Sequence, residues 1–315
     1  MPVWEEFSHR LLSVVIPCYN SEKLIHELHQ RLIKALDSMQ VAYEIIYVND
    51  DSPDHTGSIL KQVALENANV IAVDLMFNSG QFKALLCGLE LSRGSYVVTM
   101  DDDLQHPPEE IYKLYHKIKE NDQLDAVIGR YLKKKHSFFR NLGSLFMQKL
   151  SGSQRTGIKM TSFRCLSRNV VEIILMHKTT SPFIGSIIRK STRRIANVDV
   201  EHHARAQGKS NYSLKKLAVT GIDRIFHYTS VPLKLVSISG IVISIGSFAA
   251  ALYYLLAYFM GHIALPGWTT LVLLINFYAG LIILSIGIIG EYLIRILGEV
   301  SGSPSYFIRN IYRRQ

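Results

Sequence analysis

The feature that most constrains this sequence is residues 235–290, which contain no Asp, Glu, Lys or Arg. A polar break around His262, Pro266 and Gly267 divides them into two apolar segments, near 233–260 and 269–290. As helices rising about 1.5 Å per residue, both segments are long enough to cross a bilayer core of roughly 30 Å. The alternative is a pair of helices buried in a soluble core, which such long apolar runs disfavour. The sequence therefore predicts two membrane-spanning helices.

Basic residues flank this pair of segments and are absent from the loop between them. Lys216 and Lys234 precede the first segment, and Arg295 and Arg309 follow the second. The positive-inside rule then places both ends of the pair in the cytosol. The first residues lack the pattern of a cleavable secretion signal, so we expect the domain before the spans to stay cytosolic.

Composition narrows the choice of partners and of chemistry. The net charge of +9 suits a protein that lies against an anionic leaflet, and no nucleic-acid-binding motif accompanies it. The three cysteines, Cys18, Cys87 and Cys165, are widely separated and lack metal-site spacing. We expect free thiols and no nucleic-acid partner.

The first 130 residues alternate β-rich runs with helical patterns. This alternation predicts an α/β fold, a doubly wound parallel sheet with helices on both faces. The expected strands are 11–16, 43–48, 70–75, 96–100 and 126–129, and the expected helices are 22–39, 56–66, 81–92 and one opening at Pro107–Pro108.

Polar clusters follow the first four expected strands, at Asn20, 49–52, 78–81 and 101–105. The carboxyl ends of parallel strands share one edge, where such sheets bind ligands, so we expect the four clusters to meet there. Neither the Gly-rich dinucleotide turn nor the P-loop motif occurs in these turns, which disfavours a Rossmann dehydrogenase or a P-loop enzyme.

Three adjacent carboxylates, Asp101, Asp102 and Asp103, follow the fourth strand. Residues i and i+2 of an extended segment point the same way, so Asp101 and Asp103 could share a hard cation such as Mg²⁺ or Mn²⁺. From spacing alone, a solvated acidic turn explains the three residues better than a metal site does.

The ordered segments SVVIPCYNSE, YVNDDSPD, FNSGQFKA and MDDDLQHPPEE resemble the family 2 glycosyltransferases with the GT-A fold. The resemblance extends through SFRCLSR, VEHHARAQGKSNYSLKKL and GEYLIRI to PSYFIR. Within family 2, the sequence is most similar to the polyprenyl-phosphate glycosyltransferases. That subgroup includes dolichol-phosphate mannose synthases, bactoprenol glucosyltransferases and undecaprenyl-phosphate aminoarabinose transferases, which the tail resembles most.

The resemblance implies a role for each matched residue. The metal ligands would be Asp101, Asp103 and Gln105, with Asp103 counted as catalytic together with Arg130 and Arg164. The donor nucleotide would contact Pro17, Tyr19, Asn20, Glu22, Asp50, Asn78, Gly80, Gln81, Asp101 and Asp102. The acceptor phosphate would meet Arg130, Ser162, Arg164, Arg205, Lys209 and Ser210.

The resemblance also implies the reaction. A nucleotide sugar, with UDP the leading choice, would transfer its sugar with inversion to polyprenyl (undecaprenyl) phosphate, aided by Mg²⁺ or Mn²⁺. The protein would be a multi-pass, homo-oligomeric (tetrameric) enzyme of the bacterial plasma membrane, serving cell-envelope glycan modification. The sugar stays open.

The expected domain boundaries follow from both lines of reasoning. We expect a GT-A domain over 1–211, an interfacial helix over 212–232, two spans within 233–298 and a cytosolic tail over 299–315. The sequence departs from the family pattern at Asp51 and Ser162, where the family usually carries glycine.

Two other functions compete with this prediction. A processive polysaccharide synthase shares the GT-A domain, but it generally has more spans and a tryptophan-containing acceptor motif that Trp4 and Trp268 do not form. An inactive sugar-nucleotide-binding scaffold would not require the acidic triad or the basic acceptor residues.

Overall fold

The computed structural model describes residues 11–131, 157–177, 184–201, 267–300 and 304–314, with scattered residues between 238 and 260. The chain forms two compact units. One comprises 1–135, 155–209 and 302–315, and the other comprises 136–154 and 210–301. The candidate site lies in the first unit.

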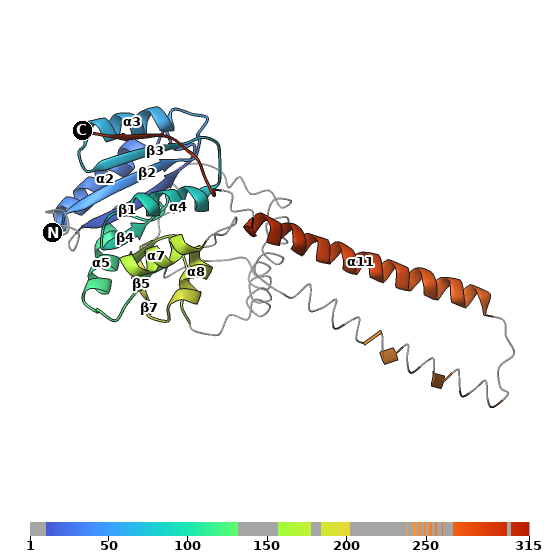
Figure 1. Cartoon of the computed structure of the whole chain (residues 1–315). Coiled ribbons are helices and arrows are strands. Elements are labelled where there is room, and N and C mark those ends of the chain that lie inside the picture. Colours follow the sequence, from blue (N-terminus) through green and yellow to red (C-terminus); the bar gives the residue numbers. More distant parts are fainter. Residues whose placement is uncertain are drawn as a thin grey trace. The chain divides into compact units, whose positions relative to one another are not determined.

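The first unit is built on an eight-stranded mixed sheet with the order β7-β5-β6-β4-β1-β2-β3-β8 (Figure 1). All five strands expected from the sequence are present, and β1, β2, β3 and β4 run parallel. The remaining strands include two antiparallel ones, β6 and β8, which a fully parallel sheet does not have. The bounds are β1 Leu12–Cys18, β2 Tyr43–Asn49, β3 Val70–Leu75, β4 Tyr96–Thr99, β5 Ala126–Tyr131, β6 Arg164–Ser167, β7 Ile195–Val200 and β8 Ile308–Arg313.

Helices cover both faces of this sheet. The apolar core on one face includes side chains of α2 (Ile25–Ser38), α3 (Thr56–Glu66) and α5 (Ile111–Lys119). The core on the opposite face includes side chains of α4 (Gln81–Leu91), α7 (Arg168–Met176) and α8 (Ile184–Ser191). The two cores confirm the expected doubly wound arrangement.

The close packing of α4 against the sheet depends on a small residue. A Cβ atom added to Gly88 would lie 2.2 Å from the Val15 side chain of β1. Only glycine lets the helix approach this strand so closely. The packing fixes α4, whose first residue, Gln81, begins at the carboxyl edge of the sheet.

The last strand of the sheet comes from the end of the chain. Residues 299–315 were expected to form a tail, but β8 pairs antiparallel with β3, with Ile311 opposite Val73. The backbone N–H of Met76 also donates to the carbonyl of Phe307, at 2.8 Å. The chain after residue 303 is therefore part of the same sheet as β1.

The second unit contains α11 (Trp268–Val300). Its segment Phe277–Ile294 is long and apolar enough to cross a membrane, judged by length and composition alone. The second predicted span, 269–290, lies within α11. Most residues of the first predicted span and all of the predicted interfacial helix lie outside the described residues.

Candidate active site

The acidic turn after β4 is tied to the loop that follows β1. Asp102 accepts a hydrogen bond from the backbone N–H of Tyr19, at 3.1 Å, and another from the hydroxyl of Ser21. The backbone N–H of Ser21 donates to the Thr56 hydroxyl at 2.8 Å, which ties this loop to the start of α3. The backbone N–H of Asn20 donates to the Ser52 hydroxyl at 3.1 Å, so the loop after β1 links the acidic turn to the turn after β2.

Asp102 differs electrostatically from an exposed carboxylate. Burial raises its pKa to about 6, and the charges of Asp101 and Asp103 act in the same direction. The hydrogen bonds from Ser21 and Tyr19 oppose this shift because they stabilise the ionised form. Asp102 therefore uses its carboxylate to hold the loop after β1.

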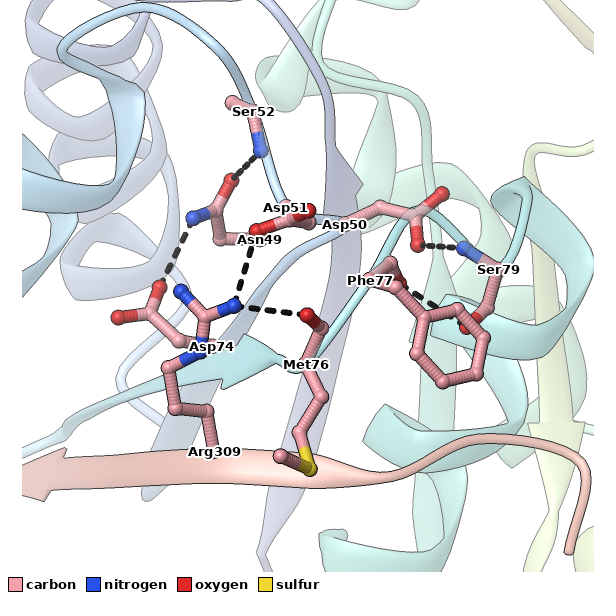
Figure 2. Close-up of polar contacts among 9 residues, drawn as sticks. All are labelled: Asn49, Asp50, Asp51, Ser52, Asp74, Met76, Phe77, Ser79 and Arg309. Atoms are coloured by element: carbon pink, nitrogen blue, oxygen red, sulfur yellow. Dashed lines mark hydrogen bonds and ion pairs between the residues drawn. The ribbon is translucent and has the colours of Figure 1, made fainter.

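A second carboxylate joins the turn after β2 to the loop after β3. The two oxygens of Asp50 accept the backbone N–H groups of Ser79, at 2.7 Å, and Gly80, at 2.8 Å. Figure 2 shows the bond from Ser79, and beside it the Asn49 amide, which donates to Asp74 and accepts from Ser52. Asp50 is only 3% exposed. It fixes the cluster at 78–81 against the cluster at 49–52.

Asp101 is held from two directions. The Gln81 amide donates to one carboxylate oxygen and the Ser162 hydroxyl donates to the other, both at 2.6 Å. Gln81 begins α4, whereas Ser162 precedes β6. All four polar clusters predicted from the sequence are therefore brought together at one edge of the sheet, and Ser162 joins them.

Strained backbone is concentrated in these turns. Among the described residues, the non-glycine positions with positive φ are Asn20 (56°), Gln40 (52°), Asp51 (51°) and Leu104 (56°). Only Gln40 lies outside the site. Asn and Asp adopt this conformation at modest cost, but a buried leucine there is uncommon. Such strain is typical of turns whose surroundings hold them for a function.

The acidic turn offers oxygen ligands, but they do not form a complete cage. Asp103 accepts the backbone N–H of Gln105 at 3.1 Å, which closes the turn. Within the part of the chain that the structure describes, no group of three or more His, Cys, Asp or Glu side chains could hold a metal ion. Asp101, Asp103 and the Gln105 amide could together supply part of an octahedral oxygen shell.

The two predicted arginines occupy different environments. Arg130 on β5 forms an ion pair with Asp199 on β7, with Nε and Oδ1 2.6 Å apart, and both side chains are partly exposed. Arg164 is 4% exposed, and its Nε donates to the Ser162 carbonyl at 3.3 Å. Burial lowers the pKa of Arg164 to about 10, and the charge of Asp101 opposes the shift. Arg164 is therefore a buried cation whose charge is favoured by Asp101.

The family model for glycosyl transferase family 2 matches residues 13–175, which contain every contact described above except Asp199. The chain belongs to glycosyl transferase family 2. It is 35% identical over 312 residues to the undecaprenyl-phosphate 4-deoxy-4-formamido-L-arabinose transferase of Edwardsiella ictaluri, covering 96% of this chain and 95% of that protein. It is also 30% identical over 306 residues to an uncharacterized glycosyltransferase of Bacillus subtilis, covering 96% and 95%.

Solved structures agree with the fold. Glucosyl-3-phosphoglycerate synthase from Mycobacterium tuberculosis, crystallised with Mn²⁺, UDP-glucose and phosphoglyceric acid, superposes with a TM-score of 0.51 at 19% identity. The match covers 72% of this chain and 83% of that one. These comparisons confirm a GT-A type α/β fold and a glycosyltransferase activity for this family 2 enzyme.

The remaining predicted residues of this glycosyltransferase take varied positions. Pro17 is buried in β1, whereas the ring of Tyr19 is 51% exposed at the edge of the sheet. Glu22 accepts the backbone N–H of His55 at 3.1 Å, so it braces the turn before α3. Asn78 is exposed in the loop after β3. Arg205, Lys209 and Ser210 lie outside the described residues.

The sequence did not single out the aromatic support beneath the acidic turn. The His106 ring stacks on Tyr131, at 5.4 Å between centroids, and on Phe163, at 5.1 Å. His106 is buried and also contacts the Tyr131 hydroxyl. Its place in the DLQHPPE segment was the available signal, but the partners come from β5 and from the segment before β6, which the sequence does not place beside it.

Proposed function

We propose that this enzyme transfers one sugar from a UDP-sugar to undecaprenyl phosphate at the cytosolic face of a bacterial plasma membrane, with inversion at the anomeric carbon. The observation that carries the proposal is the 35% identity over 96% of the chain to a relative named for undecaprenyl phosphate. Because that match extends well beyond residues 13–175, it includes the segments that a soluble family 2 enzyme does not need.

The acidic turn supports a divalent metal as cofactor. Asp101, Asp103 and Gln105 would hold Mg²⁺ or Mn²⁺, and diphosphate oxygens would complete the shell, as is usual for Mg²⁺ sites with few protein ligands. The oxygen chemistry of these side chains fits such an ion. When bound, the metal would offset the charge of the departing nucleotide diphosphate. The related fold crystallised with UDP-glucose also held Mn²⁺.

The donor would lie over the joined loops at the edge of the sheet. The exposed ring of Tyr19 offers a stacking face for a base, and Asn20 and Asn78 offer exposed amides beside it. Asp50 is committed to the N–H groups of Ser79 and Gly80, so its role is to fix the pocket, with further lone pairs left for the nucleotide.

The acceptor needs cations more than it needs a base. A phosphate monoester has a second pKa near 6 and is already largely ionised at neutral pH, so a strong general base is less necessary. Arg130 is partly exposed and could bind the lipid phosphate. On binding, its guanidinium would leave the ion pair with Asp199 and pair with the phosphate instead. Ser162 and buried Arg164 would act through Asp101, and Arg205, Lys209 and Ser210 would complete the phosphate site.

Strand pairing supports a two-span topology. Because β7 and β8 belong to one sheet, an even number of crossings between Glu201 and Ile308 would keep both strands on one side of the membrane. Phe277–Ile294 would form one crossing, and the apolar segment 233–260 would form the other. The basic flanks favour the cytosol as the shared side. The tetramer implied by the resemblance stays a prediction.

Nucleotide release by the purified full-length enzyme tests this function. We would incubate it with Mn²⁺ and one of several UDP-sugars, with and without undecaprenyl phosphate, and measure UDP. The proposal expects release that depends on the lipid for at least one sugar. Nucleotide binding without lipid-dependent release for any sugar would favour the inactive scaffold, and release that continues past one sugar per lipid would favour a processive synthase.

A further inference from the structure

A side chain from the end of the chain reaches the two donor-side loops. The Nη2 atom of Arg309 on β8 donates to the carbonyl of Met76, at 2.7 Å, in the loop after β3. The same atom lies 3.4 Å from Oδ1 of Asp51, in the turn after β2. Figure 2 shows the guanidinium between these two partners. Arg309 thus bridges two loops that the sequence places more than 200 residues away from it.

The backbone of β8 is irregular at this residue. Asn310 lies opposite Asp74 and Ile308 lies opposite Leu75, so Arg309 is the additional residue of a bulge. A bulge bends the strand and redirects the side chain of the extra residue, and bulges are frequent beside active sites. Here the redirected side chain is the one that points to the donor edge of the sheet.

Asp51 provides an unusual partner. Its φ of 51° places it in the left-handed region, which glycine, Asn and Asp tolerate best. Because Arg309 and Asp51 are 51% and 40% exposed, their ion pair alone contributes little stability. The ion pair instead helps to orient the turn that holds Asp51, because the guanidinium of Arg309 is itself fixed by its shorter bond to the Met76 carbonyl.

Asp50 and Arg309 hold the same two loops from opposite ends. Asp50 accepts the N–H groups of Ser79 and Gly80, at 2.7 and 2.8 Å, whereas Arg309 joins Met76 to Asp51. Next to Arg309, the ring of Phe307 contacts the ring of Phe77, with centroids 6.0 Å apart. The loop over residues 76–80 is therefore anchored at both of its ends, once from β2 and once from β8.

We propose that Arg309 is a positioning residue for the donor nucleotide, which makes donor affinity depend on the segment that follows α11. The inference rests on the proposed function, because the loops it aligns are those assigned to the nucleotide. Among the described residues, the polar contacts of Arg309 are with Met76 and Asp51 and not with the acidic turn. Its removal should therefore loosen donor binding and leave the acceptor step intact.

The test compares two arginines of the same strand. Arg309→Gln is measured against Arg313→Gln, since Arg313 is an exposed residue of β8 opposite Ile71, at the far end of the strand pair. The readouts are the Kd of UDP with Mn²⁺ by calorimetry, the KM of each substrate, and the thermal unfolding midpoint. For Arg309→Gln we expect UDP to bind about fivefold more weakly, because the variant loses a hydrogen bond from a charged group at a partly exposed position. The acceptor KM and the unfolding midpoint should stay unchanged, and Arg313→Gln should match the wild type.

Two further variants keep the proposal decidable if Arg309→Gln does not fold. Arg309→Lys retains the charge but not the fork, so it should recover part of the affinity. Asp51→Asn removes the charge but keeps a residue that tolerates a positive φ, and it should weaken UDP binding about twofold. In the double variant Asp51→Asn/Arg309→Gln, the loss of UDP affinity should be smaller than the sum of the two single losses.

Each outcome separates this inference from the proposed function. Wild-type affinity for UDP in Arg309→Gln, or an equal loss in Arg313→Gln, would overturn the positioning role while leaving the transferase intact. A rise in acceptor KM with unchanged UDP affinity would also overturn it. A wild-type protein that binds neither UDP, GDP nor dTDP would overturn the nucleotide-sugar function itself.

Discussion

Ser162 donates a hydrogen bond of 2.6 Å to the Asp101 carboxylate, whose second oxygen accepts an equally short bond from Gln81. A residue predicted for the acceptor side and a residue predicted for the donor side thus share one carboxylate. Asp101 has its orientation fixed before any ligand binds, which is how preorganised sites lower the cost of reaching the reactive geometry.

Replacing Asp103 by Asn should abolish most turnover. Asp103 closes the acidic turn by accepting the N–H of Gln105, and an amide oxygen can still do so. The variant should therefore fold normally, while the loss of charge stabilisation lowers kcat by about 100-fold or more. Turnover with Mn²⁺ is the measurement, and Glu109→Gln, an exposed acid of the same segment that pairs with Arg31, is the control. Undiminished activity in Asp103→Asn would contradict the assignment of Asp103 as a metal ligand.

Replacing Ser162 by Ala should weaken metal dependence without removing activity. The change frees one oxygen of Asp101, and partners that orient metal ligands are worth about tenfold or more in metal affinity. We expect the Mn²⁺ concentration for half-maximal activity to rise by about tenfold. Ser58→Ala is the control, because it removes a hydroxyl that donates to the His55 carbonyl and not to Asp101. It should behave as the wild type. An unchanged metal titration would show that Ser162 does not orient the carboxylate.

Replacing Arg130 by Gln should affect only the acceptor. We expect the KM for undecaprenyl phosphate to rise about tenfold, as for the loss of one hydrogen bond between charged groups. The donor KM should stay constant, because Arg130 pairs with Asp199 on the β5–β7 side of the sheet, away from the turns after β1 and β2. Arg194→Gln, at an exposed position before β7, is the matched control. A change confined to the donor KM would contradict the acceptor assignment.

Asp54 should contribute stability that depends on pH. Burial acts to raise its pKa, but hydrogen bonds from Thr56 and from the Glu22 N–H outweigh burial, so the pKa of Asp54 is lowered in the folded protein. A lowered pKa means stability that is present above the unfolded value, near 3.9, and is lost as the pH falls through the folded value. Asp54→Asn should therefore lower the unfolding midpoint at pH 7, and this deficit should become smaller at an acidic pH below the folded pKa of Asp54. An equal deficit at both pH values would contradict the electrostatic explanation.

Much of the fold was predictable because its first half repeats one local pattern. The strands at 11–16 and 43–48 correspond to β1 and β2, and the alternation of strand and helix is sufficient to bring their polar ends together. The spacing of the acidic turn predicted that Asp101 and Asp103 could share a cation, which stays a prediction. In the structure, Asp101 meets Gln81 and Ser162, whereas Asp102 turns to the loop after β1.

What the sequence did not reveal depends on distant pairing. The four residues of β6 and the six of β8 carry little alternation, and only their partners β4 and β3 make them strands. Arg309 and Asp51 are 258 residues apart, and no local pattern links them. The environment of Arg164 also required the structure, because its burial arises from the antiparallel insertion of β6 beside β4.

Mass spectrometry of the lipid product tests the central claim most directly. The purified full-length enzyme would be supplied with undecaprenyl phosphate, Mn²⁺ and a panel of UDP-sugars, with Asp103→Asn as the matched inactive control. We expect one new lipid species that is heavier by a single glycosyl group and that is lost with chelator and in Asp103→Asn. A product carrying several sugars, or an unmodified lipid despite UDP-sugar binding for every donor, would contradict it.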